Sequence, residues 1–197
     1  MLFRSPLMTI LHMNPRLPIW LGTGTEANVK LTAEIADGWL PLGVVPRLMP
    51  MLRPWLQEGF RRAGGGKGFA DFEIQARAEV AITDDVPGVL ARMKPRVALY
   101  VGGMGHRDKN FHTQAMTANG YGDAAERIQE LYLAKRKDEA VAAVPDEFCD
   151  EMSLVGPVAR IRERYRAWAD SGITGLTITT EQPEAMELMA SLAGPAR

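Results

Sequence analysis

The sequence predicts an α/β fold, namely part of a parallel (β/α)8 barrel of the TIM type that carries a helical insertion. Three observations lead to this prediction. Short apolar runs alternate with helical patterns and are joined by tight glycine turns, as in βαβ units. Residues 72–82 alternate apolar and polar side chains throughout, and a polar strand face can line the lumen of a barrel. From residue 84 to about residue 155 the chain adds helices without a further repeat unit.

The composition is that of an ordinary globular protein and excludes several classes of function. The chain has 197 residues, of which 46% are hydrophobic and 24% charged, with a formal net charge of −1. We therefore expect no nucleic-acid partner, and no apolar run is long enough to suggest a membrane partner. The single cysteine, Cys149, cannot form an intramolecular disulfide, which fits a cytoplasmic protein.

The first half of the chain supplies the clearest repeat units. Residues 1–17 show no convincing period, and we set them apart as a loop or as sequence outside the domain that spans 18–197. A short strand at 19–21, a helix at about 26–36 and a second strand at 39–42 then form a βαβ unit. A helix at about 46–63 and the alternating strand at 72–82 follow.

The second half adds the insertion and one more unit. Residues 84–143 have an almost wholly helical pattern, with Asp84 or Asp85 as the first cap. A strong helix opens at Gly156-Pro157 and ends at Ser171-Gly172, and a strand at 173–179 and a final helix after Pro183 follow. This gives four strands, whereas a closed barrel needs eight. An open sheet is the alternative.

The turn after the first strand is the most informative candidate site. Gly22-Thr23-Gly24-Thr25 joins the strand to the start of a helix, where backbone N–H groups lack partners within the helix. Glycine lets an anion approach, and the helix dipole favours negative charge, so a phosphate is the natural ligand. The segment is neither a Walker loop nor a GxGxxG motif. The alternative is a plain tight turn.

The remaining candidates are weaker. Glu79, with Arg77, could face the lumen near the end of its strand, or could form a salt pair on a wet face. His106 lies in a glycine-rich segment, 102–111, which could be a lid near the substrate or simply a helix end and a solvated connection. His12, His106 and His112 show no metal-binding spacing, so we expect no metal site. Nothing in the spacing assigns a catalytic residue.

Several segments together resemble the luciferase-like monooxygenases, and above all their coenzyme F420-dependent oxidoreductase branch. The resemblance runs from about residue 15 to residue 193, and the following segments carry it: Gly22–Thr25, Ala33–Pro41, Ala98–Gly105 with Lys109–Phe111, Val144–Glu147, Ser153–Pro157 and Ala169–Thr174. They correspond to the C-terminal half of the family's barrel, from its fifth strand to its eighth.

The resemblance implies a cofactor and a reaction. Family members transfer a hydride between reduced F420, or FMN in relatives, and a small organic substrate. It also implies a homodimer in the complete family proteins, and a role for Gly22, Thr23, Gly24 and Thr25 in binding the cofactor phosphate through backbone groups. The first four strands of the family have no counterpart in the sequence. They hold the cofactor ring and the proton-handling residues, so no catalytic residue carries over.

Three functions therefore remain open. The first is an F420-dependent oxidoreductase, and the second is an FMN-dependent monooxygenase. The third is a non-catalytic binding module or an inactive fragment, which the missing strands favour. A half barrel leaves open strand edges, so we expect the isolated chain to dimerise or aggregate through them.

Overall fold

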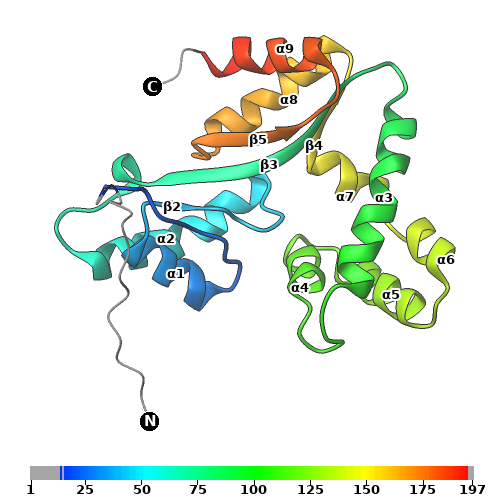
Figure 1. The fold of residues 1–197 in the computed structure, drawn as a ribbon, viewed down its shortest axis with the longest axis horizontal. Helices are drawn as coiled ribbons and strands as arrows, with labels where there is room; N and C mark the ends of the chain where they lie inside the picture. The colour runs from blue at the N-terminus through cyan, green and yellow to red at the C-terminus, as the bar shows by residue number, and fades with distance from the viewer. Residues whose placement is uncertain (1–13, 15, 195–197) are drawn as a thin grey trace.

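The computed structural model describes residue 14 and residues 16–194, and within them one parallel sheet has five strands (Figure 1). The strands are β1 (Trp20–Leu21), β2 (Gly38–Trp39), β3 (Glu73–Ile82), β4 (Ser153–Gly156) and β5 (Gly175–Thr179). Each pairing between them is parallel. The long strand β3 is the centre of the sheet, because β2, β4 and β5 all pair with it.

The two edges of β3 carry different partners. The N–H groups of Glu73 and Glu79 donate to Asp37 O (3.1 Å) and Met152 O (3.4 Å), so β2 and β4 share one edge, at opposite ends of β3. The N–H of Thr174 donates to Ile74 O (3.0 Å), which places β5 on the other edge. The strands β1, β2, β3 and β5 thus form four neighbouring parallel strands, as expected for part of a barrel.

The alternation of β3 decides which face of the sheet is covered. Ile74, Ala76, Ala78 and Val80 are buried against helices, whereas Glu73 and Arg77, on the other face, are exposed. The covering helices are α1 (Glu26–Ile35), α2 (Met49–Ala63), α8 (Val158–Asp170) and α9 (Pro183–Ala193). Two short 3-10 turns, η1 (Pro46–Leu48) and η2 (Phe69–Asp71), flank α2. We call this part of the molecule the body.

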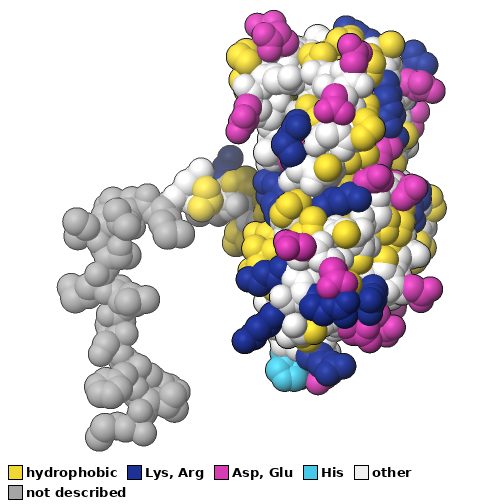
Figure 2. Space-filling view, turned by 90° about the vertical axis from the view of Figure 1, so that its right-hand side faces the viewer, with side chains coloured by type: hydrophobic (Ala, Val, Ile, Leu, Met, Phe, Trp, Pro, Cys, Tyr) yellow, Lys and Arg dark blue, Asp and Glu magenta, His cyan; other side chains and the backbone are white. Residues whose placement is uncertain are grey.

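The remaining helices form a second group beside the body (Figure 1). This insertion consists of α3 (Val86–Gly103), α4 (Phe111–Ala118), α5 (Gly122–Leu133), α6 (Lys137–Ala142) and α7 (Asp146–Glu151). The Asp85 carboxylate caps α3 by accepting from the N–H of Gly88 (2.9 Å), which confirms one of the two predicted caps. The insertion has its own buried core around Met116, Ile128 and Phe148. Acidic and basic side chains are interspersed on the face in Figure 2.

Two sequence predictions about the strands need correction. The structure has a strand at Ser153–Gly156, where the sequence analysis had extended the helical insertion to about residue 155, so the strands number five in the described part rather than four. This segment is short and buried at all four positions, so it shows no alternation, and it is a strand because it pairs with 79–82 of β3. The second strand is also shorter than predicted, Gly38–Trp39 instead of 39–42.

Candidate functional site

The candidate site lies where β1 and β2 end. Trp20 and Leu21 pair with Gly38 and Trp39, so the turn 22–25 and the segment 40–48 leave the sheet side by side at its carboxyl edge. Ligand sites of parallel α/β folds lie at this edge. The predicted strand at 19–21 is thus part of a parallel sheet, as the phosphate-site hypothesis requires.

The turn itself leaves a row of backbone donors free. Within the described residues, the N–H groups of residues 22–28 donate to no protein acceptor. The first such bond of the helix runs from the N–H of Val29 to Thr25 O (2.8 Å). The Thr25 side chain makes no capping hydrogen bond, and the Glu26 carboxylate accepts from Lys30 Nζ (2.5 Å). Among the side chains that the structure describes, none therefore accepts a hydrogen bond from these amides in place of a ligand.

Side chains hold the turn in this form. The indole Nε1 of Trp39 donates to Thr23 O (2.9 Å), and the hydroxyls of Thr23 and Thr32 share a hydrogen bond of 2.8 Å. An added Cβ at Gly24 would meet no atom within 4 Å, and at Gly22 it would meet only Leu40 O, at 3.8 Å. The glycines thus keep open space above the amides rather than filling a packed position.

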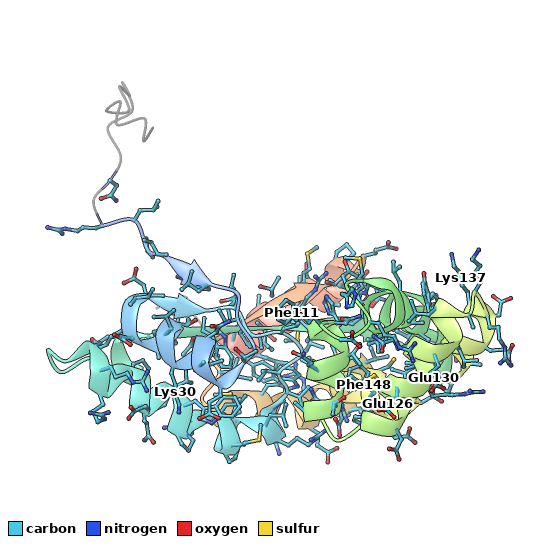
Figure 3. All side chains as sticks on the ribbon, turned by 90° about the horizontal axis from the view of Figure 1, so that it is seen from below. Lys30, Phe111, Glu126, Glu130, Lys137 and Phe148 are labelled. Carbon is cyan, nitrogen blue, oxygen red and sulfur yellow. The ribbon has the colours of Figure 1, made fainter. Side chains whose placement is uncertain are left out.

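Two adjoining clefts open from this edge. The turn cleft, about 370 Å³, lies between the turn 22–25, the apolar side chains Trp39, Met51 and Trp55, and Phe111 of α4. The insertion cleft, about 560 Å³, lies between β3, α3, α4 and α7. Leu42, Val44, His112, Ala115 and Asn119 line both clefts. Figure 3 labels Phe111, at the start of α4 on the side of the insertion that faces α1, and Lys137 on the side farther from α1.

Charged groups gather in the insertion cleft. Arg96 donates from Nη2 to Glu79 Oε2 (3.1 Å), which neutralises that carboxylate. Arg77 donates to the Thr179 hydroxyl (3.1 Å) and forms no ion pair with another residue of the described part. The ring of His112 contacts that of Tyr100 with a centroid distance of 4.6 Å, and burial lowers the pKa of His112. The imidazole is therefore neutral near pH 7.

The single thiol does not suit nucleophilic chemistry. Cys149 lies in the wall of the insertion cleft and is buried. Burial raises the pKa of its thiol to about 11, so the reactive thiolate is scarce at neutral pH. Cys149 thus acts as a small apolar side chain.

Most of the predicted site residues line one of the two clefts, but His106 does not. Gly22, Thr23, Gly24 and Thr25 line the turn cleft, and Glu79 lines the insertion cleft. His106 lines neither cleft; it is exposed in a turn, where its Nδ1 accepts from the N–H of Asp108 (3.3 Å).

The sequence analysis did not single out Arg96, Tyr100 or His112 as residues of the candidate site. One available signal was Asn110, which caps α4 by accepting from the N–H of His112 (2.8 Å) and so fixes where that helix begins.

Two broader searches cover the residues that the structure describes. Among them, no helix combines the length and apolarity that crossing a membrane requires. In the same residues, no three or more His, Cys, Asp or Glu side chains form a group that could bind a metal ion.

Comparison with known families decides the classification. The sequence model of the family described as "Luciferase-like monooxygenase" matches residues 3–175. The chain belongs to the luciferase-like monooxygenase family. The match begins within the segment 1–17 that the sequence analysis had set apart from the domain.

Two curated proteins illustrate this membership. A Mycobacterium tuberculosis protein whose name gives it a provisional assignment as a coenzyme F420-dependent oxidoreductase is 40% identical over 176 residues, which are 89% of this chain and 51% of that protein. The 5,10-methylenetetrahydromethanopterin reductase of Methanopyrus kandleri is 24% identical over 177 residues, 88% of this chain and 48% of that protein. This luciferase-like chain thus spans about half the length of the curated relatives it matches.

Solved structures confirm the fold. The coenzyme F420-dependent tetrahydromethanopterin reductase from Methanopyrus kandleri superposes with a TM-score of 0.67 at 21% identity, covering 88% of this chain and 49% of the other. An F420-dependent secondary alcohol dehydrogenase, in complex with an F420-acetone adduct, gives 0.64 at 12% identity, covering 92% and 50%. These likenesses confirm the predicted partial barrel.

Proposed function

We propose that this chain forms the part of an F420-dependent oxidoreductase that binds the cofactor phosphate, and that the enzyme transfers a hydride between the deazaflavin and a small organic substrate. One observation carries the proposal: the N–H groups of residues 22–28 donate to no acceptor within the described part of the chain, and they lie at the carboxyl edge of a parallel sheet, beside an open cleft. The names of the relatives support F420 as the cofactor.

The residues present fit a phosphate group. Several amides at a helix start offer hydrogen bonds without a desolvated cation, and the helix dipole adds to them. The open space at Gly24 lets an anion come close to the backbone. Gly22, Thr23, Gly24 and Thr25 would hold the phosphate, and the bound deazaflavin would supply the hydride-carrying ring. Trp39 keeps the turn in place through Thr23, and Met51 and Trp55 give the cleft an apolar wall that limits water.

FMN is the second candidate cofactor. It also carries a phosphate, and the family that matches this chain is named for monooxygenases. The same amides would bind either phosphate, so only direct titration separates the two. A homodimer and a cytoplasmic location remain predictions from the family resemblance and the composition.

The test is a substitution that blocks access to the free N–H groups of residues 22–28 without disturbing the fold. Gly24→Leu places a side chain over the amides, while its backbone lies outside the left-handed region and its Cβ meets no atom within 4 Å. We expect F420 to bind at least tenfold more weakly, because charge-assisted hydrogen bonds contribute about 1.5–3 kcal/mol. Fluorescence titration of this chain with F420, and in parallel with FMN, measures the change.

Gly68→Leu is the matched control. Gly68 also has open space around its Cβ and an ordinary φ, but it precedes β3 at the other end of the sheet. It should bind F420 as the parent chain does. Equal F420 affinity in the parent and Gly24→Leu contradicts the phosphate site, and tight binding of FMN alone rejects F420 as the cofactor.

A further inference from the structure

We propose that the insertion cleft is the substrate pocket, that it takes a monocarboxylate with an aromatic or alkyl body, and that Arg77 binds the carboxylate. The proposal rests on the proposed function, because it names the class of substrate that the proposed enzyme would bind. Its own evidence is independent of the amides at the turn. It lies in the charges, the walls and the position of this cleft.

The charged side chains that line the insertion cleft include one cation without an anionic partner in the described part of the chain. Its lining includes Arg77, Glu79 and Arg96, and the ion pair of 3.1 Å cancels the last two. Arg77 keeps a full positive charge, with only the Thr179 hydroxyl as a hydrogen-bond partner in the described part. A planar guanidinium matches a carboxylate through two parallel N–H···O bonds. His112 adds no charge near pH 7, because burial lowers its pKa.

The walls of the cleft fit an apolar body. Besides the polar groups they carry Met93, Val97, Tyr100, Met116, Phe148 and Met152. Methionine side chains adapt to irregular ligands, and aromatic rings offer flat contact surfaces. A volume of about 560 Å³ lies within the ordinary range of small-molecule pockets. A small polar substrate such as a sugar would leave this apolar surface uncompensated.

The position of the cleft also suits a substrate. It adjoins the turn cleft through shared residues such as His112 and Val44. The turn 22–25 and Arg77 therefore lie in two connected clefts, the first in the turn cleft and the second in the insertion cleft. A cofactor whose phosphate occupies the turn cleft would leave the insertion cleft to another molecule.

A matched pair of ligands tests the anchor without any cofactor. Naphthalene-2-acetate carries the carboxylate, and naphthalene-2-acetamide has nearly the same shape without the charge. Calorimetric titration of this chain should show the acid binding about tenfold more tightly than the amide, the difference expected for one accessible charge-assisted contact. Arg77→Gln should abolish that preference and leave the affinity for the amide unchanged.

Arg92→Gln is the control variant. Arg92 lies on α3 with Arg96, is exposed, and does not line the cleft. It should keep the tenfold preference. Arg77 is exposed, and its side chain makes a single hydrogen bond to the residues that the structure describes, so its substitution should preserve the fold, which circular dichroism verifies.

The outcomes separate this proposal from the function on which it rests. Equal binding of acid and amide, no binding of either, or the same result for Arg77→Gln and Arg92→Gln overturns the pocket. Gly24→Leu should weaken F420 binding and leave the naphthalene acid unaffected. Loss of the F420 site with a retained preference at Arg77 would remove the proposed function and keep the anion pocket.

Discussion

The body and the insertion bury their apolar side chains in different ways. The insertion surrounds its core with helices from α3 to α7. The body covers only one face of its sheet and leaves apolar side chains along its flank. Leu31 and Ile35 of α1 are 45% and 62% exposed. They lie away from α2, since Gly59 of α2 approaches α1 at Lys30 and Ala33 instead.

The opposite flank of the body shows the same feature. On α9, Met186, Ala190 and Ala193 follow helical spacing along one side and are exposed. In a barrel, each helix packs against the helices of the units before and after it. The flanks of the body therefore carry apolar side chains at positions that the neighbouring helices of a barrel would cover, whereas the exposed apolar side chains of the insertion, such as Phe111 and Leu133, lie outside such a repeat. The difference teaches that the apolar flanks of the repeat units follow from the barrel pattern, in which each unit packs against the next.

The largest expected effects come from opening one core at a time. Leu56→Ala in the body and Ile128→Ala in the insertion each remove a fully buried side chain, which costs about 2–5 kcal/mol. All four tryptophans lie outside the insertion, and the single cysteine, Cys149, lies inside it. Tryptophan fluorescence therefore follows the body in a denaturant titration, and labelling of Cys149 by a thiol reagent follows the insertion.

We expect each substitution to shift mainly the probe of its own region. Leu56→Ala should lower the denaturant midpoint seen by fluorescence, and Ile128→Ala the midpoint seen by labelling. Two variants that move both probes equally would mean that body and insertion unfold as one unit. Coupling of this kind would run through contacts such as Arg47 of η1, which donates to Glu151 Oε2 (2.6 Å) and Asn119 O (2.6 Å) of the insertion side.

The flank of α1 gives the next largest effect, on association. We expect the chain to form dimers or larger species, because uncovered strand edges and apolar helix sides favour self-association. Leu31→Glu with Ile35→Glu should shift the population towards the monomer, since burying such a side chain contributes about 1.5–3 kcal/mol. Light scattering coupled to size-exclusion chromatography measures the mass.

A control on the insertion sharpens this prediction. Leu99 of α3 is 42% exposed, similar to Leu31, yet lies on the insertion rather than on a flank of the body. Leu99→Glu should leave the mass unchanged. A parent chain that is a monodisperse monomer at every concentration would contradict the role of the flanks.

The comparison also explains which features the sequence could predict. Strand β3 and the turn at 22–25 follow from local patterns, the first from alternation and the second from glycines before a helix start. The insertion cleft does not, because its groups meet through tertiary packing. Glu79 and Arg96 are 17 residues apart, and Arg77 and Thr179 are 102 apart. No spacing rule joins residues at such distances.

The glycine-rich segment 102–111 matches the second of its two interpretations, a helix end and an exposed connection, because α3 ends at Gly103. It drew attention to His106, which proves to be exposed and outside both clefts, whereas His112, only six residues on, lines both. Gly102 and Gly103 instead allow α3 to approach Tyr132, whose atoms an added Cβ would meet at 2.4 Å and 2.5 Å. Their role is close packing inside the insertion, not the mobility that a glycine run suggests.

The smallest expected effect is on the pH dependence of stability, through His112. Burial lowers the pKa of His112 below its ordinary 6.5, so just below that pH the unfolded chain binds a proton that the folded chain does not. The neutral His112 ring therefore costs the folded chain no stability above pH 6.5. The folded chain loses stability relative to the unfolded chain as the pH falls towards the lowered pKa of His112. His112→Gln should reduce the loss of melting temperature between about pH 7.5 and about pH 5.5, by less than about 3 °C because the ring is partly exposed. An unchanged pH dependence in His112→Gln would mean that the burial of His112 is not the cause.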